Sequence, residues 1–324
     1  MIIVTGGAGL IGSAVVWKLN GRGVDDILIV DHNPNGDKDD NLAALKYSQY
    51  LDKSDFLQKL FDGRLSESIE SIIHLGACTD TTETDKEYLY QNNFDYTRKL
   101  ASYAVNNKIR FIYASSAATY GNGEKGYADD ENLIPALEPL NEYARSKQMF
   151  DLWATENGLT DRIAGLKYFN IFGPNEGHKG EMRSMVAKAF EQIWSSGEVR
   201  LFKSHREEYE DGEQQRDFLY VKDAAEITLF FLDNPALNGI YNVGSGRAES
   251  WNVLTNALFE ALDLEPKIRY IDMPGNIREQ YQYHTRAETK KLIDSGYQSD
   301  ITPLDEAIRD YVTNYLIPGS HLGS

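Results

Sequence analysis

Tyr143 and Lys147 are the residues whose types and spacing most directly suggest chemistry. They stand four positions apart in the stretch 142–157, whose pattern predicts a helix, so both side chains would lie on one face, one turn apart. A phenol with a pKa of about 10 is a weak base at neutral pH, and a neighbouring ammonium lowers that pKa. Such a tyrosine could exchange a proton with a substrate hydroxyl while a hydride moves to or from a nicotinamide. Tyrosine and lysine four apart also occur by chance in helices, so the pair alone does not decide the chemistry.

Ser116 is a candidate partner for this pair. It follows the strand predicted at 111–114, at the edge of the sheet where ligands of open α/β folds bind. Its hydroxyl could hydrogen-bond the reacting oxygen and help to orient the tyrosine. The alternative is a serine that only closes a turn, which also applies to the adjacent Ser115.

The stretch MIIVTGGAGLIG at the start of the sequence predicts where a dinucleotide would bind. An apolar strand leads into Gly6, Gly9 and Gly12 and then into a helical pattern. Glycines at such a turn let backbone N–H groups approach a pyrophosphate, which then lies at the N-terminus of the helix. The next strand, 27–30, ends at Asp31, where an acidic residue commonly meets the adenosine ribose. The alternative is a plain strand–turn–helix whose glycines serve packing only.

Alternating strands and helices must position these groups. Continuous apolar strands separated by helices indicate a parallel sheet covered on both faces. The fold class is therefore α/β: a Rossmann-type, doubly wound parallel sheet with a smaller, discontinuous α+β substrate lobe. The later strands are predicted at 71–77, 111–114, 163–172, 217–221 and 238–243, and the helices near 86–106, 142–157, 181–196, 223–233 and 250–262.

The smaller lobe is expected to consist of insertions between core elements, because no Pro- or Ser-rich linker divides the chain. We expect a dinucleotide-binding domain at 1–170, rejoined by about 217–243. The substrate-binding lobe is expected mainly at 171–216 and 244–316. Residues 319–324 resemble a vector-derived tail and are left out of the predicted fold.

The charge and composition of the chain limit the kinds of molecule that it could bind. The formal net charge of −17 disfavours nucleic acid and anionic membranes, which need a basic face, so an anionic ligand would need a local basic pocket. Cys78 is the single cysteine, which excludes an intramolecular disulfide and fits a reducing cytoplasm. We expect no signal peptide, no membrane span and no metal site.

Three motifs together resemble the extended short-chain dehydrogenase/reductases, which act mostly on nucleotide sugars. They are the glycine turn, the run YASSAATYG at 113–121, and Tyr143-x-x-x-Lys147. The resemblance covers nearly the whole chain. It implies that Ser116, Tyr143 and Lys147 are catalytic and that Lys147 also holds the nicotinamide ribose.

Further runs resemble one branch of that family, the ADP-L-glycero-D-manno-heptose 6-epimerases. This resemblance implies epimerisation of a nucleotide-linked heptose at carbon 6, in the synthesis of lipopolysaccharide inner-core precursors, by a homo-oligomer expected to be a pentamer. The resemblance also implies that Lys179 is a second acid/base beside the tyrosine. The alternative is that Lys179 is only a solvent-exposed charged residue of a loop. The runs are YFNIFGP at 168–174, EGHKG at 176–180, HLGAC at 74–78, RDF at 216–218 and NVGSGRAES at 242–250.

The same resemblance implies a set of substrate contacts. Arg216 suits a diphosphate because a guanidinium binds phosphate oxygens in a bidentate way, but among its acidic neighbours it could equally form a surface ion pair. Glu181 stands where the branch has a small polar residue, and the acidic loop 204–216 is longer than expected. The implied contacts are Ser116, Asn170, His178, Lys179, Glu181, Lys188, Phe202, Arg216 and Tyr281.

The choice of nicotinamide cofactor depends on two residues. Asp31 alone points to NAD, because a carboxylate repels a 2′-phosphate. The resemblance favours NADP, through a lysine that matches Lys38, although Lys38 could be only one charge in a solvated acidic turn. NADP is therefore expected, with NAD as the alternative. The implied cofactor contacts are Gly6, Gly9, Leu10, Ile11, Gly12, Asp31, His32, Lys38, Lys53, Leu75, Gly76, Ala77, Cys78, Thr79, Asn92, Tyr143, Lys147 and Ile171.

Three rival functions share parts of this pattern. A UDP-hexose 4-epimerase would have the same fold and the same serine, tyrosine and lysine, but its reaction would not explain the His178-Lys179-Gly180 run. A sugar 4,6-dehydratase needs acidic residues directly after the serine, where this chain has Ala117 and Ala118. A non-catalytic dinucleotide-binding scaffold would tend to lose the tyrosine or the lysine, and this chain keeps both.

Overall fold

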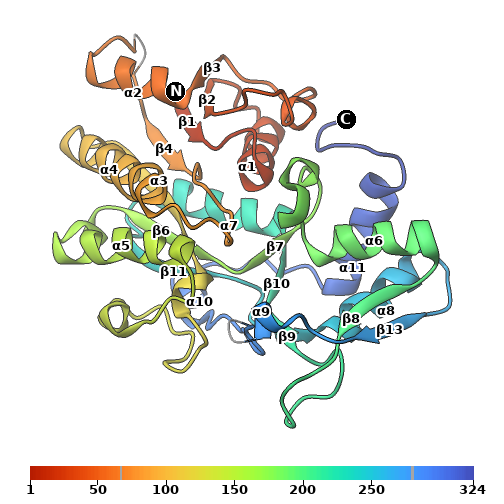
Figure 1. Cartoon of the computed structure of the whole chain (residues 1–324). Helices are drawn as coiled ribbons and strands as arrows, with labels where there is room; N and C mark the ends of the chain where they lie inside the picture. Colours follow the sequence, from red (N-terminus) through yellow and green to blue (C-terminus); the bar gives the residue numbers. More distant parts are fainter. Residues whose placement is uncertain (66–67, 279–280) are drawn as a thin grey trace.

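A seven-stranded parallel sheet forms the centre of the protein in the computed structural model, which describes residues 1–65, 68–278 and 281–324 (Figure 1). The strand order is β3-β2-β1-β4-β5-β6-β11, and all neighbours run parallel. The order reverses between β1 and β4, the switch point at which doubly wound folds bind ligands. The predicted fold class is confirmed. The strands are β1 (Ile2–Thr5), β2 (Ile27–Asp31), β3 (Gln49–Asp52), β4 (Ser71–His74), β5 (Arg110–Ser116), β6 (Ala164–Tyr168) and β11 (Gly239–Val243).

Both faces of this sheet are buried because its apolar side chains alternate between two hydrophobic clusters. Val4 and Ile29 point into a cluster with α1 and α7, whereas Ile3 and Leu28 point into a second cluster with α2, α4 and α5. This alternation explains why the strands read as continuous apolar runs. The covering helices are α1 (Leu10–Gly21), α2 (Lys53–Phe61), α3 (Lys86–Leu89), α4 (Tyr96–Asn106), α5 (Glu142–Glu156) and α7 (Val221–Asp233).

The helix predicted near 86–106 has three parts. Between α3 and α4, residues Tyr90–Asp95 form a π-helical turn, a feature that often accompanies functional sites. Within this turn, Asn93 donates to the carbonyl of Cys78 at 2.9 Å and to Ser146 Oγ at 3.0 Å. The turn therefore ties the segment after β4 to helix α5.

The chain leaves the main sheet where the apolar run 163–172 changes sheets. The run is not one strand, because β6 ends at Tyr168 and Asn170–Phe172 (β7) pairs with Phe218–Tyr220 (β10) in a separate two-stranded sheet. The other elements of this half are β8 (Val199–Phe202), β9 (Gln215–Arg216), β12 (Glu249–Ser250), β13 (Ile268–Ile271), α6 (Met185–Ser196), α8 (Trp251–Ala261), α9 (Gly275–Arg278), α10 (Lys290–Asp294) and α11 (Leu304–Tyr311).

The segment 319–324, which the sequence did not lead us to include in the fold, packs onto the protein. Leu322 is 1% exposed and belongs to the cluster of α1 and α7. Its backbone N–H donates to Asn175 Oδ1 at 3.0 Å. A vector origin of these residues stays a prediction.

The described part of the chain was searched for membrane-spanning helices and for clusters of metal-binding side chains. None of its helices is long and apolar enough to cross a membrane. Across the same residues, no group of three or more His, Cys, Asp and Glu side chains is placed to hold a metal ion.

Candidate active site

The predicted trio meets at the carboxyl end of β5. Ser116 is the last residue of β5, and Tyr143 and Lys147 lie on the first two turns of α5. That helix begins here because the Asn141 side chain accepts a backbone N–H of its first turn. The Ser116 side chain lies near the Tyr143 hydroxyl and opposes the effect of burial on its pKa. The Lys147 Nζ donates to the carbonyl of Ala114 at 2.9 Å.

Burial dominates the protonation of this trio. It raises the pKa of Tyr143, against the opposing hydrogen bond from Ser116. The expected lowering of the tyrosine pKa by its lysine is therefore not what the structure shows. Burial also lowers the pKa of Lys147 to about 8, against the opposing negative charge of Asp151. At neutral pH Tyr143 is protonated, ready to donate, and Lys147 is mainly a cation.

A buried ion pair lies one helical turn beyond Lys147. The Asp151 carboxylate pairs with Lys167 Nζ at 2.6 Å, and these side chains are 0% and 1% exposed. Asp151 also accepts hydrogen bonds from Ser115 at 2.7 Å and Tyr113 at 2.9 Å. The pair thus connects α5, β5 and β6 directly behind the trio.

The glycine turn has the close packing that a dinucleotide cradle requires. Gly6 has φ +67°, and a Cβ at Gly12 would lie 2.0 Å from the carbonyl oxygen of Gly6. A Cβ at Gly6 would lie 2.7 Å from the backbone nitrogen of Gly76. The N–H of Ala8 donates to Asp31 Oδ2 at 2.9 Å, which holds this carboxylate at the end of β2. These residues fit a dinucleotide whose pyrophosphate lies at the N-terminus of α1.

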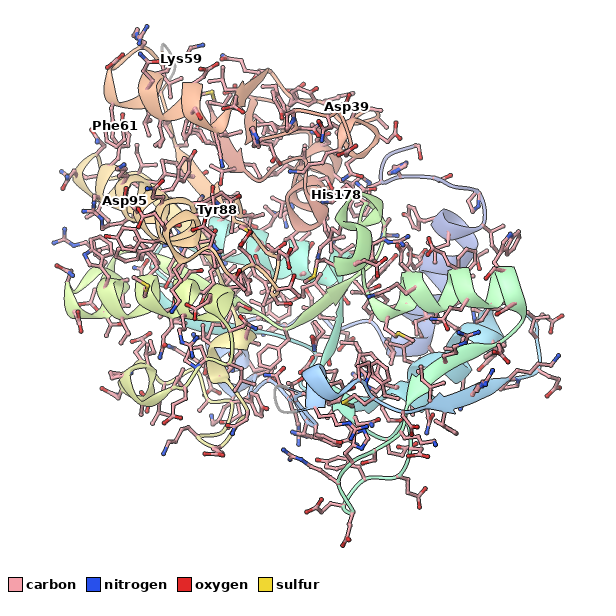
Figure 2. The ribbon with its side chains drawn as sticks, viewed as in Figure 1. Asp39, Lys59, Phe61, Tyr88, Asp95 and His178 are labelled. Atoms are coloured by element: carbon pink, nitrogen blue, oxygen red, sulfur yellow. The ribbon has the colours of Figure 1, made fainter. Side chains whose placement is uncertain are left out.

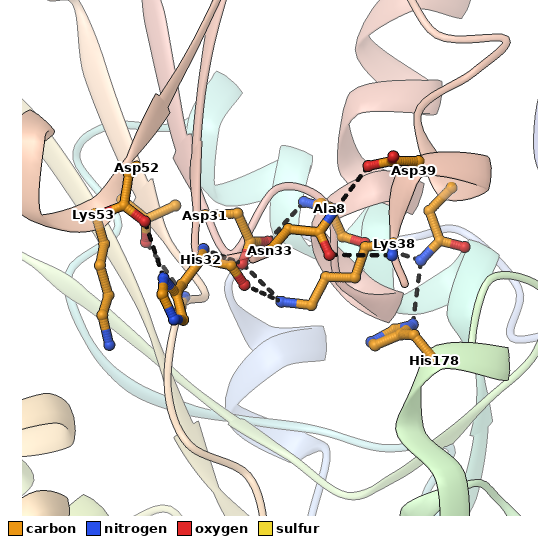
Figure 3. Close-up of polar contacts among 12 residues, drawn as sticks. Ala8, Asp31, His32, Asn33, Lys38, Asp39, Asp52, Lys53 and His178 are labelled. Carbon is orange, nitrogen blue, oxygen red and sulfur yellow. Dashed lines mark hydrogen bonds and ion pairs between the residues drawn. The ribbon is translucent and has the colours of Figure 1, made fainter. Parts of the chain in front are cut away.

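Lys38 covers the Asp31 carboxylate. Its Nζ lies 2.7 Å from Asp31 Oδ1 and 3.1 Å from the carbonyl oxygen of His32 (Figure 3). A cation therefore stands where a ribose 2′ substituent would meet Asp31.

One cleft of about 1590 Å³ brings most of the predicted cofactor residues together with the trio. Three of the predicted residues do not line it. The His32 ring lies 2.9 Å from Asp52 (Figure 3), and Lys53 Nζ donates to Asn92 Oδ1 at 2.7 Å. Those that line it are Gly6, Gly9, Leu10, Ile11, Gly12, Asp31, Lys38, Leu75, Gly76, Ala77, Cys78, Thr79, Tyr143, Lys147 and Ile171.

The loop after β7 carries His178 and Lys179 into the same cleft. Figure 2 shows His178 on this loop, beside the elements of the glycine turn. Burial and the charges of Lys38 and Lys179 lower the pKa of His178 to about 4, so its ring is neutral at neutral pH. Burial lowers the pKa of Lys179, against the opposing charge of Glu176. Among the described residues, nothing accepts a hydrogen bond or ion pair from Lys179 Nζ.

Arg216 forms a basic subsite within the same cleft. It is 8% exposed, and its guanidinium lies 5.6 Å from the ring centre of Trp251 and 5.1 Å from that of Tyr281. Nη1 donates to the carbonyl of Gln215 at 2.8 Å. No carboxylate pairs with Arg216 within the described ranges, so the surface ion pair is not observed. A buried, unpaired guanidinium is suited to bind an anion such as a diphosphate.

The other predicted substrate residues divide into two groups. Glu181 is exposed and outside the lining, and its carbonyl oxygen accepts from Lys188 Nζ at 2.8 Å. Phe202 is also outside the lining and lies edge-on to Tyr281. The binding roles of these residues stay predictions. Those that line the cleft are Ser116, Asn170, His178, Lys179, Lys188, Arg216 and Tyr281.

Several residues of the site were missed from the sequence. Trp251 lines the cleft, and its indole N–H donates to the Tyr281 hydroxyl at 2.8 Å. Its only sequence signal is an aromatic residue at the start of a predicted helix. Asn41, Asn175 and Asp151 support the site through long-range contacts, for which local sequence gives no signal.

Comparison with known proteins agrees with this geometry. Residues 2–244 match the NAD dependent epimerase/dehydratase family. The chain is 48% identical over 316 residues to a protein of Nitratidesulfovibrio vulgaris named ADP-L-glycero-D-manno-heptose-6-epimerase, covering 98% of each. A Fusobacterium nucleatum protein of the same name is 46% identical, again covering 98% of each. The crystal structure of the Helicobacter pylori enzyme of that name superposes with a TM-score of 0.79 at 28% identity, covering 97% of this chain and 95% of that one.

Proposed function

The chain belongs to the NAD dependent epimerase/dehydratase family, and we propose that it inverts carbon 6 of ADP-glycero-manno-heptose from the D-glycero to the L-glycero form. One observation carries the choice of reaction. The cleft holds Tyr143 and, on a separate loop, the ammonium of Lys179, which has no hydrogen-bond or ion-pair partner among the described residues. A reaction that presents both faces of a carbonyl can use one proton-transfer group on each side. Relatives 46–48% identical over nearly the whole chain carry the name of this activity.

The chain's own residues then have distinct tasks. A nicotinamide dinucleotide, when bound, supplies the hydride acceptor and donor. The phenolate form of Tyr143, which is the minor form at neutral pH because burial raises the pKa of this residue, takes the proton of the carbon-6 hydroxyl as that carbon is oxidised, and Ser116 hydrogen-bonds the same oxygen. The resulting carbonyl turns its other face by rotation about the bond between carbons 5 and 6. Lys179 supplies a proton to the oxygen from the opposite side as hydride returns. Tyr143 then releases the proton it gained to solvent and Lys179 regains one from solvent, so that protons and electrons balance over one turnover.

The basic residues of the cleft would hold the anionic and polar parts of the ligands. Arg216 would bind the diphosphate of the nucleotide sugar, because it is buried without a counter-ion in the described residues. Lys147 would bind the nicotinamide ribose. These local cations would attract an anionic substrate although the protein carries a net charge of −17.

NADP is the cofactor that we propose. The ammonium of Lys38 lies against Asp31, so it offsets the carboxylate that would repel a 2′-phosphate and offers a donor to that phosphate. Mass spectrometry of the supernatant from denatured protein would identify the resident dinucleotide. NADP is expected, whereas NAD alone would overturn this choice.

The assay of the wild-type protein with ADP-D-glycero-D-manno-heptose tests the function. We expect conversion to the L-glycero epimer, measured by chromatography or NMR. Lys179→Met should lower turnover by about 10²-fold or more, the scale for loss of a general acid/base, while Lys290→Met at an exposed position should not. If the wild type ignores this sugar and interconverts UDP-glucose and UDP-galactose, the 4-epimerase alternative replaces the proposal. If Lys179→Met is fully active, its acid/base role is withdrawn.

We also propose that the protein acts in the cytoplasm, in the supply of heptose precursors for lipopolysaccharide. A single cysteine fits that reducing compartment. The expected homo-oligomer stays a prediction.

A further inference from the structure

Asn175 stands at the start of the loop that carries Lys179 and is tied to two other segments. It is 4% exposed and has φ +74°, a left-handed conformation that asparagine tolerates better than most residues. Its Nδ2 donates to Ser13 Oγ at 2.9 Å, on the first turns of α1. Its Oδ1 accepts the backbone N–H of Leu322 at 3.0 Å. One side chain therefore connects the glycine-turn helix, the loop and the segment Gly319–Ser324.

The segment Gly319–Ser324, called the terminal segment below, is packed rather than loosely attached. The Leu322 side chain is 1% exposed within the main hydrophobic cluster. A Cβ on Gly323 would lie 3.1 Å from the Leu45 side chain and 3.4 Å from that of Ala44. Figure 1 shows the chain running from α11 back to the dinucleotide-binding elements, where it ends beside the loop after β7.

Glu176 fastens both ends of the same loop. It is buried, and its carboxylate accepts hydrogen bonds from the Ser184 hydroxyl at 2.7 Å and from the backbone N–H of Gly173 at 3.3 Å. It also accepts the backbone N–H of Ser184. The residues between these anchors, which include Lys179, are thereby held as a closed loop.

Asn41 connects this loop to the cofactor turn. Its Nδ2 lies 2.8 Å from the carbonyl oxygen of Ala8, 3.1 Å from that of Asn175 and 3.2 Å from His178 Nδ1. Asn41 is also buried and follows the segment that carries Lys38. The positions of Lys179 and of the dinucleotide turn are thus set through a shared network of buried amides.

We propose that the terminal segment and Asn175 are positioning elements of the active site, which hold the Lys179 loop at a fixed distance from the dinucleotide turn. Without this tie, the loop would keep its contacts with Glu176, Asn41 and Lys188 but would lose its link to α1 and the terminal segment, and it would sample other positions. Its consequence for turnover rests on the proposed function, whereas its consequence for loop order does not.

The test combines three changes with a matched control. Asn175→Gly keeps the left-handed backbone and removes both side-chain ties, Leu322→Ala removes the buried anchor, and a third variant lacks residues 319–324. The control is Ile317→Ala, which removes an aliphatic side chain that is 50% exposed just before the segment. Thermal unfolding is measured for each, and Asn175→Asp, which keeps only the acceptor for Leu322, serves if the other variants fold poorly.

The first measurement is trypsin cleavage after Lys179 and Arg183 in the cofactor-loaded protein, mapped by mass spectrometry. We expect cleavage at these bonds to become about tenfold faster in the three variants, as local opening becomes easier, and to stay unchanged in the control. Unchanged cleavage in Asn175→Gly would overturn the proposal.

The second measurement separates positioning from general destabilisation. We expect kcat for the heptose to fall about 10- to 100-fold, the scale for a misplaced catalytic group, with KM and cofactor content near the wild-type values. Faster cleavage with unchanged kcat would overturn the positioning role. If the wild type does not use the heptose but the loop still opens in the variants, the proposed function fails and the tie itself is supported.

Discussion

The buried pair of Asp151 and Lys167 allows a stability prediction that needs no assumption about the substrate. Asp151→Asn would leave the Lys167 ammonium almost fully buried with Thr119 Oγ1 at 2.7 Å and the Tyr120 ring as its remaining partners. Removal of one partner of a buried ion pair typically costs about 3–5 kcal/mol. Lys167→Met should lie at the lower end of this range, because the carboxylate keeps two hydroxyl donors. Replacing both residues (Asp151→Asn with Lys167→Met) leaves no buried charge and should restore most of the loss.

The free energy of unfolding of the four proteins, from urea titration followed by tryptophan fluorescence, gives the coupling energy. We expect about 4–6 kcal/mol of coupling between the two positions, because two single losses of about 3–5 kcal/mol are mostly restored in the double variant. Asp151→Asn should also lower the pKa of Lys147 further, because the Asp151 charge opposes the effect of burial on that ammonium. Strictly additive losses, or single losses below about 1 kcal/mol, would refute this account of the pair.

Three further predictions concern the cleft. Tyr143→Phe should reduce turnover by about 10²-fold or more with the cofactor still bound, and unchanged turnover would exclude Tyr143 as the acid/base. Lys38→Ala should weaken NADP binding by about 10- to 100-fold, which is the contribution of one hydrogen bond to a charged group, and should leave NAD binding nearly unchanged. Calorimetric titrations with each dinucleotide measure both affinities. Equal losses for NADP and NAD would contradict the role of Lys38 in binding a 2′-phosphate. Burial lowers the pKa of Lys147 from 10.5 to about 8 in the folded protein. The unfolded chain therefore binds the proton of Lys147 more tightly than the folded chain does. Because of this difference, Lys147 makes the cofactor-free protein more stable as the pH rises from about 8 to 10.5. Lys147→Met should flatten that part of the stability profile, and an identical slope in both proteins would show that the group is not buried as a cation.

Local pattern was sufficient for most of the fold. Apolar strands between helices predicted the doubly wound sheet, and the spacing of Tyr143 and Lys147 predicted the face on which they meet. The run 163–172 shows where pattern fails. The strand of the main sheet and the strand that pairs with β10 have the same apolar character, so nothing in the sequence marks the change of sheet at Phe169. The π-helical turn within 86–106 is hidden for a similar reason, because a single extra residue per turn hardly alters a helical pattern.

The missed parts of the site act over long sequence distances. Asn175 is more than one hundred positions from both Ser13 and Leu322, yet it binds both. Its neighbours in sequence predict only a turn after Gly173-Pro174. The terminal segment has the glycine and serine content of a flexible tail, and only one apolar residue in it, Leu322, indicated that it could pack. Burial likewise decided the protonation of Tyr143, and burial cannot be read from the i, i+4 spacing.

The position of β11 at the edge of the main sheet affects how the chain can fold while it is being synthesised. This strand, Gly239–Val243, pairs with β6, but the ribosome makes the whole segment from β7 to α7 between them. At a translation rate of roughly 5–20 residues per second, β6 is synthesised several seconds before β11, the strand that pairs with its outer edge. Until then the nascent chain presents an open, apolar strand edge of the kind that invites aggregation. Nascent chains that stop before residue 239 should therefore depend on chaperones more than chains that extend beyond 243.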